Sequence, residues 1–260
     1  MKKSEYKSGS QERFGYEWEK FSQIIPEYET QFLKWVYPLK KNDFKDKTIL
    51  DAGCGIGRNS YWPLTYGAKE LLAFDYDKRT IAVARRNLSQ FRHAKVIFKS
   101  IYDLDLKNKF DIAFSIGVIH HLANPSLAVK KMVDSVKKNG TVLIWVYGYE
   151  GNEWIVKYVD PIRKITSRLP LKIVNLFAYF LSIPLYTYVK LSPQKSPYLK
   201  QLSRFKFWHL HSIVFDQLIP KIANYWKKEE AEGLLKKAEL KDVQIYKVNN
   251  NSWTVLGKKK

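Results

Sequence analysis

The fold is decided by the stretch Ile49-Leu50-Asp51-Ala52-Gly53-Cys54-Gly55-Ile56-Gly57. It begins with two apolar side chains and an acid, which is typical of the end of a buried strand. Three glycines at alternate positions then let the backbone turn sharply, and a ligand can lie against main-chain atoms where a Cβ would collide. The stretch therefore predicts a strand, a ligand-binding turn and a helix that begins near Arg58.

A second acid supports this interpretation. The segment Glu70-Leu71-Leu72-Ala73-Phe74-Asp75 is predicted to form the next strand, with Asp75 at its carboxyl end. An acid in this place binds ribose hydroxyls in nucleotide-binding βαβ units. A dinucleotide site would need a small residue where Arg58 stands, and Asp51 suits a ligand with an amino group better than one with two phosphates. Another nucleotide ligand on a Rossmann-like domain is the alternative.

Strands and helices alternate beyond this unit, which predicts a parallel sheet covered by helices on both faces. The chain closes with a helix and two further strands. The predicted strands are 47–51, 70–75, 95–99, 110–115, 141–147, 242–248 and 252–256, and the predicted helices are 58–66, 78–91, 125–138 and 227–238.

These features resemble the class I S-adenosylmethionine-dependent methyltransferases. The resemblance rests on Asp51-x-Gly53-x-Gly55-x-Gly57 with Asp75, and it continues in order and spacing to Tyr147. It implies an α/β fold: a Rossmann-like, doubly wound, mostly parallel seven-stranded sheet, with an N-terminal helical lid and a helical insertion after the fifth strand. It also implies S-adenosyl-L-methionine as cofactor, with S-adenosyl-L-homocysteine as product.

The resemblance divides the chain into four parts. Residues 1–40 are expected to be a tail and helical lid, 41–148 the cofactor-binding core, 149–225 a basic and aromatic cap, and 226–260 the helix and strand pair that complete the core. The apolar positions of the first part recur at helical spacing. They fit a lid over the cofactor, or a helix that only packs on the sheet.

The resemblance also assigns the cofactor contacts. It places the glycine turn along the methionine part, Asp51 near the amino group and Asp75 on the ribose. Tyr76 is expected on the adenine, a segment beginning at Ser100 at the adenine edge, and the end of the fourth strand at the sulfonium. The expected cofactor-binding residues are Asp51, Gly53, Cys54, Gly55, Gly57, Asp75, Tyr76, Ser100, Ile101, Asp103, Ser115 and Ile116.

Two adjacent histidines follow the fourth strand. A neutral imidazole can take a proton from an acceptor hydroxyl, so His120 or His121 is a candidate general base. Structural histidines, in an enzyme that needs no base, are the alternative. No metal is expected, because no acidic cluster with ligand spacing lies beside them. The candidate substrate residues are Tyr16, Trp145, Tyr147, His211, Asp216 and Tyr225.

Charge and composition limit the classes of binding partner and the cellular compartment that we expect. The net charge of +20, from 45 basic and 25 acidic residues, predicts attraction to polyanions. The single cysteine, Cys54, excludes an internal disulfide and a cysteine zinc cluster, which favours a reducing cytoplasm. The start Met1-Lys2-Lys3 leads into polar residues, so we expect no signal sequence.

The insertion carries an apolar, aromatic run over 173–189 with cationic flanks. Its length and its polar residues, Asn175 among them, argue against a transmembrane helix. Two interpretations remain: a helical cap over the active site, and an interfacial element at an anionic membrane, with the protein then at the inner face of the membrane.

The function predicted from these residues is methyl transfer to a small-molecule or lipid-linked acceptor, at oxygen first and carbon next. A tRNA or rRNA methyltransferase is the alternative. Nucleic acid is the less favoured partner, because neither an [Asp/Asn]-Pro-Pro-[Tyr/Phe] motif nor a second cysteine is present. A non-catalytic, cofactor-binding partner of a membrane is a further alternative, which the intact glycine and acid pattern disfavours.

Overall fold

The computed structural model of the chain describes residues 22–191 and 197–260. A seven-stranded sheet forms its centre, in the order β3-β2-β1-β4-β5-β7-β6. Strands β1 to β5 are parallel, and β7 runs antiparallel between β5 and β6. The fold predicted from the sequence is confirmed. The strands are β1 (Thr48–Ala52), β2 (Glu70–Asp75), β3 (Ala94–Phe98), β4 (Phe110–Ile116), β5 (Val136–Tyr147), β6 (Lys241–Val248) and β7 (Ser252–Lys258).

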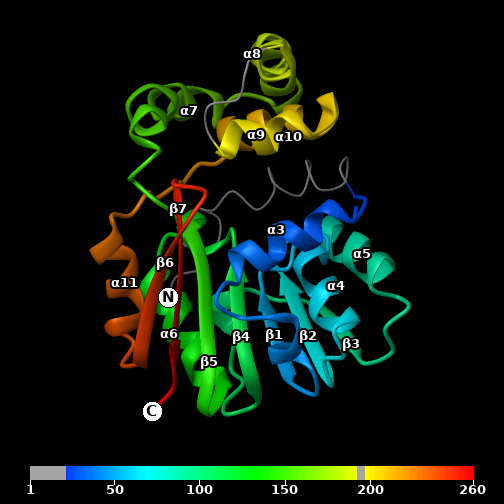
Figure 1. The fold of residues 1–260 in the computed structure, drawn as a ribbon, viewed down its shortest axis with the longest axis vertical. Helices are drawn as coiled ribbons and strands as arrows, with labels where there is room; N and C mark the ends of the chain where they lie inside the picture. Colours follow the sequence, from blue (N-terminus) through cyan, green and yellow to red (C-terminus); the bar gives the residue numbers. More distant parts are fainter. Residues whose placement is uncertain (1–21, 192–196) are drawn as a thin grey trace.

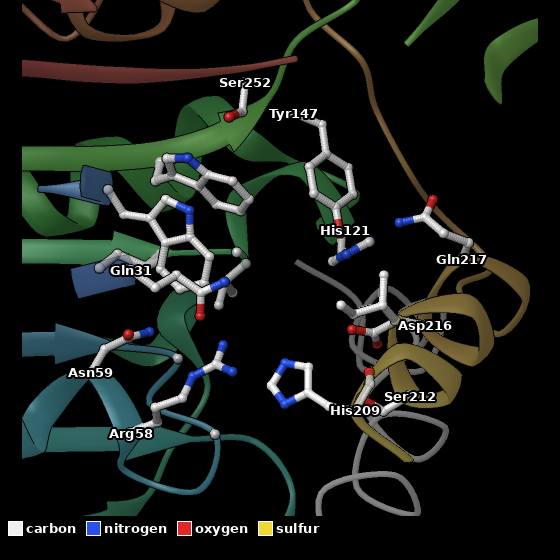
Figure 2. A pocket seen from close by; sticks show the side chains of 18 of the residues that line it. Gln31, Arg58, Asn59, His121, Tyr147, His209, Ser212, Asp216, Gln217 and Ser252 are labelled. Carbon is white, nitrogen blue, oxygen red and sulfur yellow. The ribbon is translucent and has the colours of Figure 1, made fainter. Parts of the chain in front are cut away.

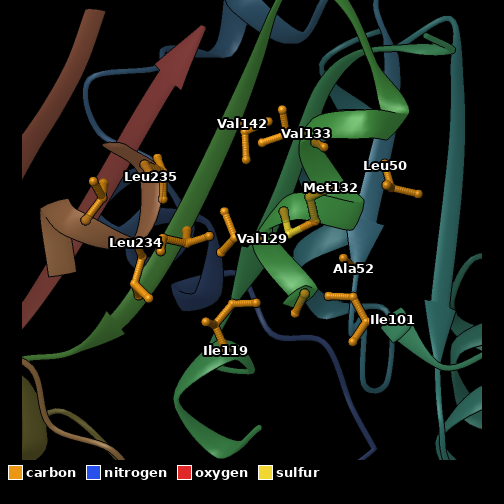
Figure 3. Packing of buried hydrophobic residues seen from close by; sticks show 14 of the residues in the cluster. Leu50, Ala52, Ile101, Ile119, Val129, Met132, Val133, Val142, Leu234 and Leu235 are labelled. Carbon is orange, nitrogen blue, oxygen red and sulfur yellow. The ribbon is translucent and has the colours of Figure 1, made fainter. Parts of the chain in front are cut away.

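Helices cover both faces of the sheet because alternate strand residues point to opposite sides. Leu50 packs in a cluster with the helices on one face, whereas its neighbour Ile49 packs in the cluster on the other. Figure 3 shows the first cluster, in which Val129 and Leu234 approach the sheet. That face carries α6 (Pro125–Ser135) and α11 (Lys228–Lys236), and the other carries α3 (Glu27–Trp35), α4 (Arg58–Thr65) and α5 (Lys78–Asn87).

The helices begin where the sequence supplies caps. The carboxylate of Asp77 accepts hydrogen bonds from the amides of Arg79 and Thr80 at the start of α5. The side chain of Asn124 caps α6 in the same way, with proline in its first turn. Gly57 precedes α4 with φ of 81°, a conformation that glycine adopts without strain. Three short 3-10 segments complete the core: η1 (Lys41–Phe44), η2 (Ile101–Asp103) and η3 (Ile119–His121).

The boundary between α6 and β5 differs from the prediction. The helix predicted over 125–138 ends at Ser135, and β5 begins at Val136. Val136 pairs with Phe110, while Thr141 pairs with Ile112, so the residues between them form an irregularity within the strand. Asn139 takes φ of 60° there. Strand pairing continues on both sides of this irregularity.

The insertion forms a helical cap at one end of the sheet (Figure 1). It consists of a π-helical turn η4 (Ile155–Val159), α7 (Asp160–Thr166), α8 (Leu171–Leu191), α9 (Pro197–Ser203) and α10 (Phe207–Leu218). Two small apolar clusters hold the cap together, and both join α8 to α10. The cap therefore has a core of its own, separate from the two clusters that flank the sheet.

Candidate active site

A cavity of about 1440 Å³ lies between the carboxyl ends of the strands and the cap. This is the edge at which open α/β sheets bind ligands. The core contributes the glycine turn after β1, the end of β2 and the loop after β4, and the cap contributes α8 and α10. Helix α3 contributes Tyr28, Gln31 and Trp35, although its Phe32 is buried against Phe114 of the sheet. Helix α3 thus both packs on the sheet and forms part of the cavity wall.

The glycine turn is fixed to the neighbouring strand. The amides of Gly53 and Cys54 both donate to the carbonyl oxygen of Phe74, each at 2.9 Å. Gly53 has φ of 88°, and a Cβ there would lie 2.5 Å from Cγ2 of Val118. Only glycine therefore fits this position without displacing Val118. Gly53, Cys54 and Gly55 line the cavity.

Asp75 lies where β2 ends, and it lines the cavity beside the glycine turn. Its carboxylate accepts hydrogen bonds from the amides of Gly55 at 2.9 Å and Asp77 at 3.2 Å. Burial raises the pKa of Asp75 to about 6. Tyr76 follows it and stacks on Phe98 with a centroid distance of 5.1 Å. A carboxylate beside an aromatic face suits a nucleoside, with hydroxyl donors for the acid and a ring for the tyrosine.

Three other predicted cofactor residues support the wall from behind. Asp51, Gly57 and Ser115 are not among the residues that line the cavity. The Oγ of Ser115 donates to the carbonyl oxygen of Ala52 at 2.7 Å, which ties β4 to β1 instead of facing a ligand. The carboxylate of Asp51 accepts from Oγ of Ser60 at 2.6 Å, and burial raises the pKa of Asp51 to about 7.

Of the residues predicted at the adenine edge, some line the cavity and one does not. Ser100 and Ile101 line the cavity, and so do Lys99 and Tyr102 around them. Asp103, however, is exposed and does not line it. Ile116 lines the cavity as predicted.

The two histidines have different surroundings. His121 lines the cavity, and its Nδ1 donates to the carbonyl oxygen of Ile222 at 2.7 Å, which makes Nε2 the proton-accepting nitrogen. Burial lowers the pKa of His121 to about 4, so the ring is neutral at pH 7. His120 is fully buried, stacks on Tyr147 at 3.7 Å between centroids and does not line the cavity. Of the pair, His121 is the one that lines the cavity.

An aromatic column forms the wall beside His121. Tyr147 stacks on Tyr225 as well as on His120, and Trp145 meets Tyr147 edge-on. The buried Arg163 donates to the hydroxyl of Tyr225 at 2.9 Å, which fixes the outer end of the column. The predicted substrate residues Trp145, Tyr147, Asp216 and Tyr225 all line the cavity.

The other two predicted substrate residues, His211 and Tyr16, are not found in the cavity lining. Tyr16 lies outside the described residues. His211 is fully buried inside the cap and does not line the cavity. Its Nδ1 lies 3.0 Å from Oγ of Ser182, and its Nε2 lies 3.2 Å from Oδ1 of Asn175. The expectation of a substrate contact is corrected: this ring joins α10 to α8.

Three residues from distant parts of the chain, Tyr28, Arg58 and His209, meet in the wall of the cavity. The guanidinium of Arg58 lies over the ring of Tyr28 at 4.7 Å, and the hydroxyl of Tyr28 lies 3.3 Å from Nδ1 of His209. Figure 2 shows Arg58 and His209 pointing toward each other. Burial and the nearby Arg58 lower the pKa of His209 to about 4. No local pattern could reveal this group, because its members come from α3, α4 and α10.

The comparison with protein families bears on the cofactor. Residues 50–144, which contain the glycine turn, Asp75 and His121, match the family model of a methyltransferase domain. This chain contains a methyltransferase domain. The resemblance stated from the sequence is thereby confirmed, and S-adenosylmethionine is the cofactor that this resemblance implies. Among residues 22–191 and 197–260, no three histidine, cysteine or acidic side chains are grouped so that they could hold a metal ion.

Relatives of the methyltransferase domain match only part of the chain. A tRNA U34 carboxymethyltransferase of Campylobacter hominis is 31% identical over 122 residues, which are 44% of this chain and 40% of that protein. The Helicobacter pylori protein of the same name is 29% identical over 120 residues, 43% of this chain and 45% of the relative. The chain thus spans less than half the length of these curated relatives.

Solved structures extend the similarity to the whole fold. A S-adenosylmethionine-dependent methyltransferase of Aquifex aeolicus aligns over 91% of this chain and 99% of its own, at a TM-score of 0.51 and 13% identity. Human N-acetylserotonin methyltransferase, crystallised with S-adenosylmethionine, aligns over 90% of this chain and 52% of its own, at a TM-score of 0.53 and 14% identity. At these identities the likeness establishes the fold alone.

The residues present fit this cofactor. The glycine turn offers bare backbone, Asp75 offers a carboxylate for ribose hydroxyls, and the neighbouring Tyr76 offers an aromatic surface. Behind the turn, burial raises the pKa of Asp51, because a negative charge is costly away from water. The positively charged methionine end of the cofactor would reduce that cost.

This arrangement predicts that the cofactor binds more tightly as pH rises from 5.5 to 7.5. The pKa values of Asp75 and Asp51, about 6 and about 7, are raised by burial, so both carboxyls are largely protonated at the lower pH. A cationic ligand favours the ionised forms, and the dissociation constant should fall by about tenfold over this range. Calorimetric titrations at both pH values would measure it.

Asp51→Asn is the matched variant for this pH dependence, because an amide can still accept the hydrogen bond of Ser60 but cannot ionise. The cofactor affinity of this variant should vary less with pH than that of the wild type. A wild-type cofactor affinity independent of pH would contradict the assignment of these carboxyls to the cofactor site.

The raised pKa values of Asp51 and Asp75 also affect the stability of the cofactor-free protein. The stability that these two carboxyls contribute is complete below pH 3.8 and is lost as pH rises through 6 to 7.

Proposed function

We propose that this protein transfers a methyl group from S-adenosylmethionine to a small, largely apolar or lipid-linked acceptor, with a hydroxyl oxygen as the preferred acceptor atom and carbon next. The observation that carries the proposal is the single cavity that joins the cofactor-binding edge of the sheet to the cap. Its cap side is rich in apolar side chains, among them Leu181, Leu185, Phe205 and Ile213. Such a wall favours an apolar acceptor.

The chemistry divides between cofactor and protein. S-adenosylmethionine, when bound, supplies a methyl group on a sulfonium. The protein holds the acceptor in line and keeps water out, which is the main contribution that an enzyme makes to such a displacement. The column of Tyr147 and Tyr225 gives a flat surface for the acceptor, and Nε2 of His121 is placed to take the hydroxyl proton. Arg58 gives the same cavity a cation for an anionic substituent.

A tRNA acceptor is the second candidate. The names of the curated relatives and the charge of +20 favour it. The matches behind those names cover less than half of this chain, however, and the apolar wall belongs to the cap. A nucleic-acid base could also stack on Tyr147 or Tyr225. An apolar acceptor would therefore lie against the cap, whereas a tRNA would place one base on the tyrosines and the rest of the molecule outside the cavity.

Incubation with methyl-labelled cofactor would separate them. Cell extract would be divided into lipid, RNA, protein and small-metabolite fractions, and each fraction incubated with the protein. We expect label in the lipid or small-metabolite fraction. The control is the Asp75→Ala variant, which should transfer little label at the same cofactor concentration.

Label in RNA would overturn the preferred acceptor and support the tRNA candidate. Absence of label in every fraction, with measurable cofactor binding, would contradict the proposed enzyme activity and favour a protein that binds the cofactor without catalysis.

A further inference from the structure

Exposed apolar side chains are concentrated on the cap. Among the described residues, sixteen large apolar side chains are exposed, and thirteen of them lie between residues 154 and 208. Scattered apolar residues are normal on a protein surface, whereas a concentration on one element marks an interaction site. The core of the same chain, by contrast, buries its apolar residues on both faces of the sheet.

Helix α8 shows the pattern most clearly. Ile173, Leu176, Phe180 and Ile183 are spaced as one face of a helix, and each is more than half exposed. Its opposite face, with Val174 and Ala178, is buried in the cluster shared with α10. A surface helix of a soluble protein carries polar residues on its outer face. The outer face of α8 is apolar instead.

A second apolar stripe lies before α8. Tyr158, Ile162 and Ile165 follow each other at helical spacing along η4 and α7, and Ile165 is 65% exposed. Together with the outer face of α8 they form what we call the apolar cap face. The residues of this face are Tyr158, Ile162, Ile165, Ile173, Leu176, Phe180, Ile183, Tyr188 and Leu191.

The sequence of the cap is strongly basic. Between residues 154 and 208 the sequence has ten lysines and arginines, and its single acid is Asp160. Asp160 is engaged by Arg163 at 3.1 Å and by Lys164 at 3.7 Å. Lys172 and Lys190, near the two ends of α8, are both exposed. Apolar side chains framed by cations match the surface of an anionic bilayer, which offers acyl chains beneath negative headgroups.

The contacts of α8 favour docking over spanning. Over the described part of the chain, α8 is the one helix long and apolar enough to cross a membrane, and 22% of its most apolar window is buried. Its Ser182 and Asn175 are both within hydrogen-bond distance of His211 on α10. Moving α8 away from α10 into the hydrocarbon region would break both of these contacts of the fully buried His211 ring.

We propose that the apolar cap face docks on an anionic lipid bilayer, with α8 lying along the interface. Leu181 and Ile162 are exposed and also line the cavity, and the same is true of Trp154 and Trp208. The mouth of the cavity therefore lies beside the docked face. That a lipid-linked acceptor enters there from the bilayer rests on the proposed function, whereas docking itself does not require methyl transfer.

Vesicle sedimentation of the full chain tests docking. The probes are vesicles of phosphatidylcholine alone and vesicles with equal parts of phosphatidylcholine and phosphatidylglycerol. We expect binding to the anionic vesicles that weakens with added salt. A variant with both Leu176→Asp and Phe180→Asp should bind them at least tenfold more weakly, because acids replace the most exposed central side chains. Tyr37→Asp is the matched control, since Tyr37 is 53% exposed outside the cap.

The outcomes separate docking from other occupants of the face. Unchanged circular dichroism and cofactor affinity would show that the double variant is folded. Failure of the wild type to bind anionic vesicles, or equal binding by the double variant, would overturn the proposal. So would a wild-type dimer that the double variant converts to a monomer, or loss of tRNA binding in place of vesicle binding. Vesicle binding without methylated lipid would contradict only the proposed acceptor.

Discussion

Replacing Asp75 by alanine should weaken S-adenosylmethionine binding by about ten- to one-hundredfold. The carboxylate lies at the end of β2 in the cavity wall, and hydrogen bonds to a charged acceptor contribute about 1.5–3 kcal/mol. Each 1.4 kcal/mol is about a tenfold change in a dissociation constant. Isothermal titration calorimetry of the cofactor measures the effect directly.

Asp103→Ala is the matched control, because Asp103 also belongs to the predicted cofactor set but is exposed and does not line the cavity. Its affinity should equal that of the wild type. Since Asp75 also accepts from the amide of Gly55, thermal unfolding of the cofactor-free variant would show whether the turn survives. Unchanged cofactor affinity in a folded Asp75→Ala protein would mean that the ribose does not bind at this acid.

Replacing His121 by alanine should lower kcat by about a hundredfold or more, with little change in cofactor affinity. General base catalysis typically contributes this much, and the bond from Nδ1 to Ile222 leaves Nε2 to accept a proton. His93→Ala is the control, because His93 is exposed and lies outside the cavity lining. Single-turnover rates at saturating cofactor would separate the chemical step from binding.

The pH profile distinguishes a base from a structural histidine. Because burial lowers the pKa of His121 to about 4, its ring is already neutral at pH 6, and kcat should be flat between pH 6 and 8. A lowered histidine pKa also means that this group's contribution to stability is complete above 6.5 and is lost as pH falls toward 4. A nearly wild-type kcat in the His121→Ala protein would mean that His121 is structural and only holds the chain at Ile222.

The sequence predicted the parts of the site that are continuous in the chain. The glycine turn and Asp75 come from one βαβ unit, in which local geometry fixes their relative position. The sequence also indicated that one of the two histidines would face a ligand. Which one does so depends on the stacking of His120 on Tyr147, a contact with β5 that adjacent residues cannot specify.

The predicted site residues that do not line the cavity share one cause. Ser115 and Asp51 belong to strands whose ends approach the cofactor edge, but their side chains bond to Ala52 and Ser60. His211 was a candidate substrate residue, yet its partners lie on α8, about thirty residues earlier in the sequence. In each case the direction of a side chain was decided by a partner that is not its neighbour in the chain.

By itself, the sequence determined the fold and the cofactor-binding edge, because hydrophobic periodicity and glycine conformation act over short stretches of chain. The tertiary structure decided the shape of the cavity, the meeting of Arg58, Tyr28 and His209, and which face of α8 is left outward. These depend on how the cap packs over the sheet, and packing joins residues whose separation in the sequence carries no pattern. The acceptor wall is therefore a product of the assembled fold.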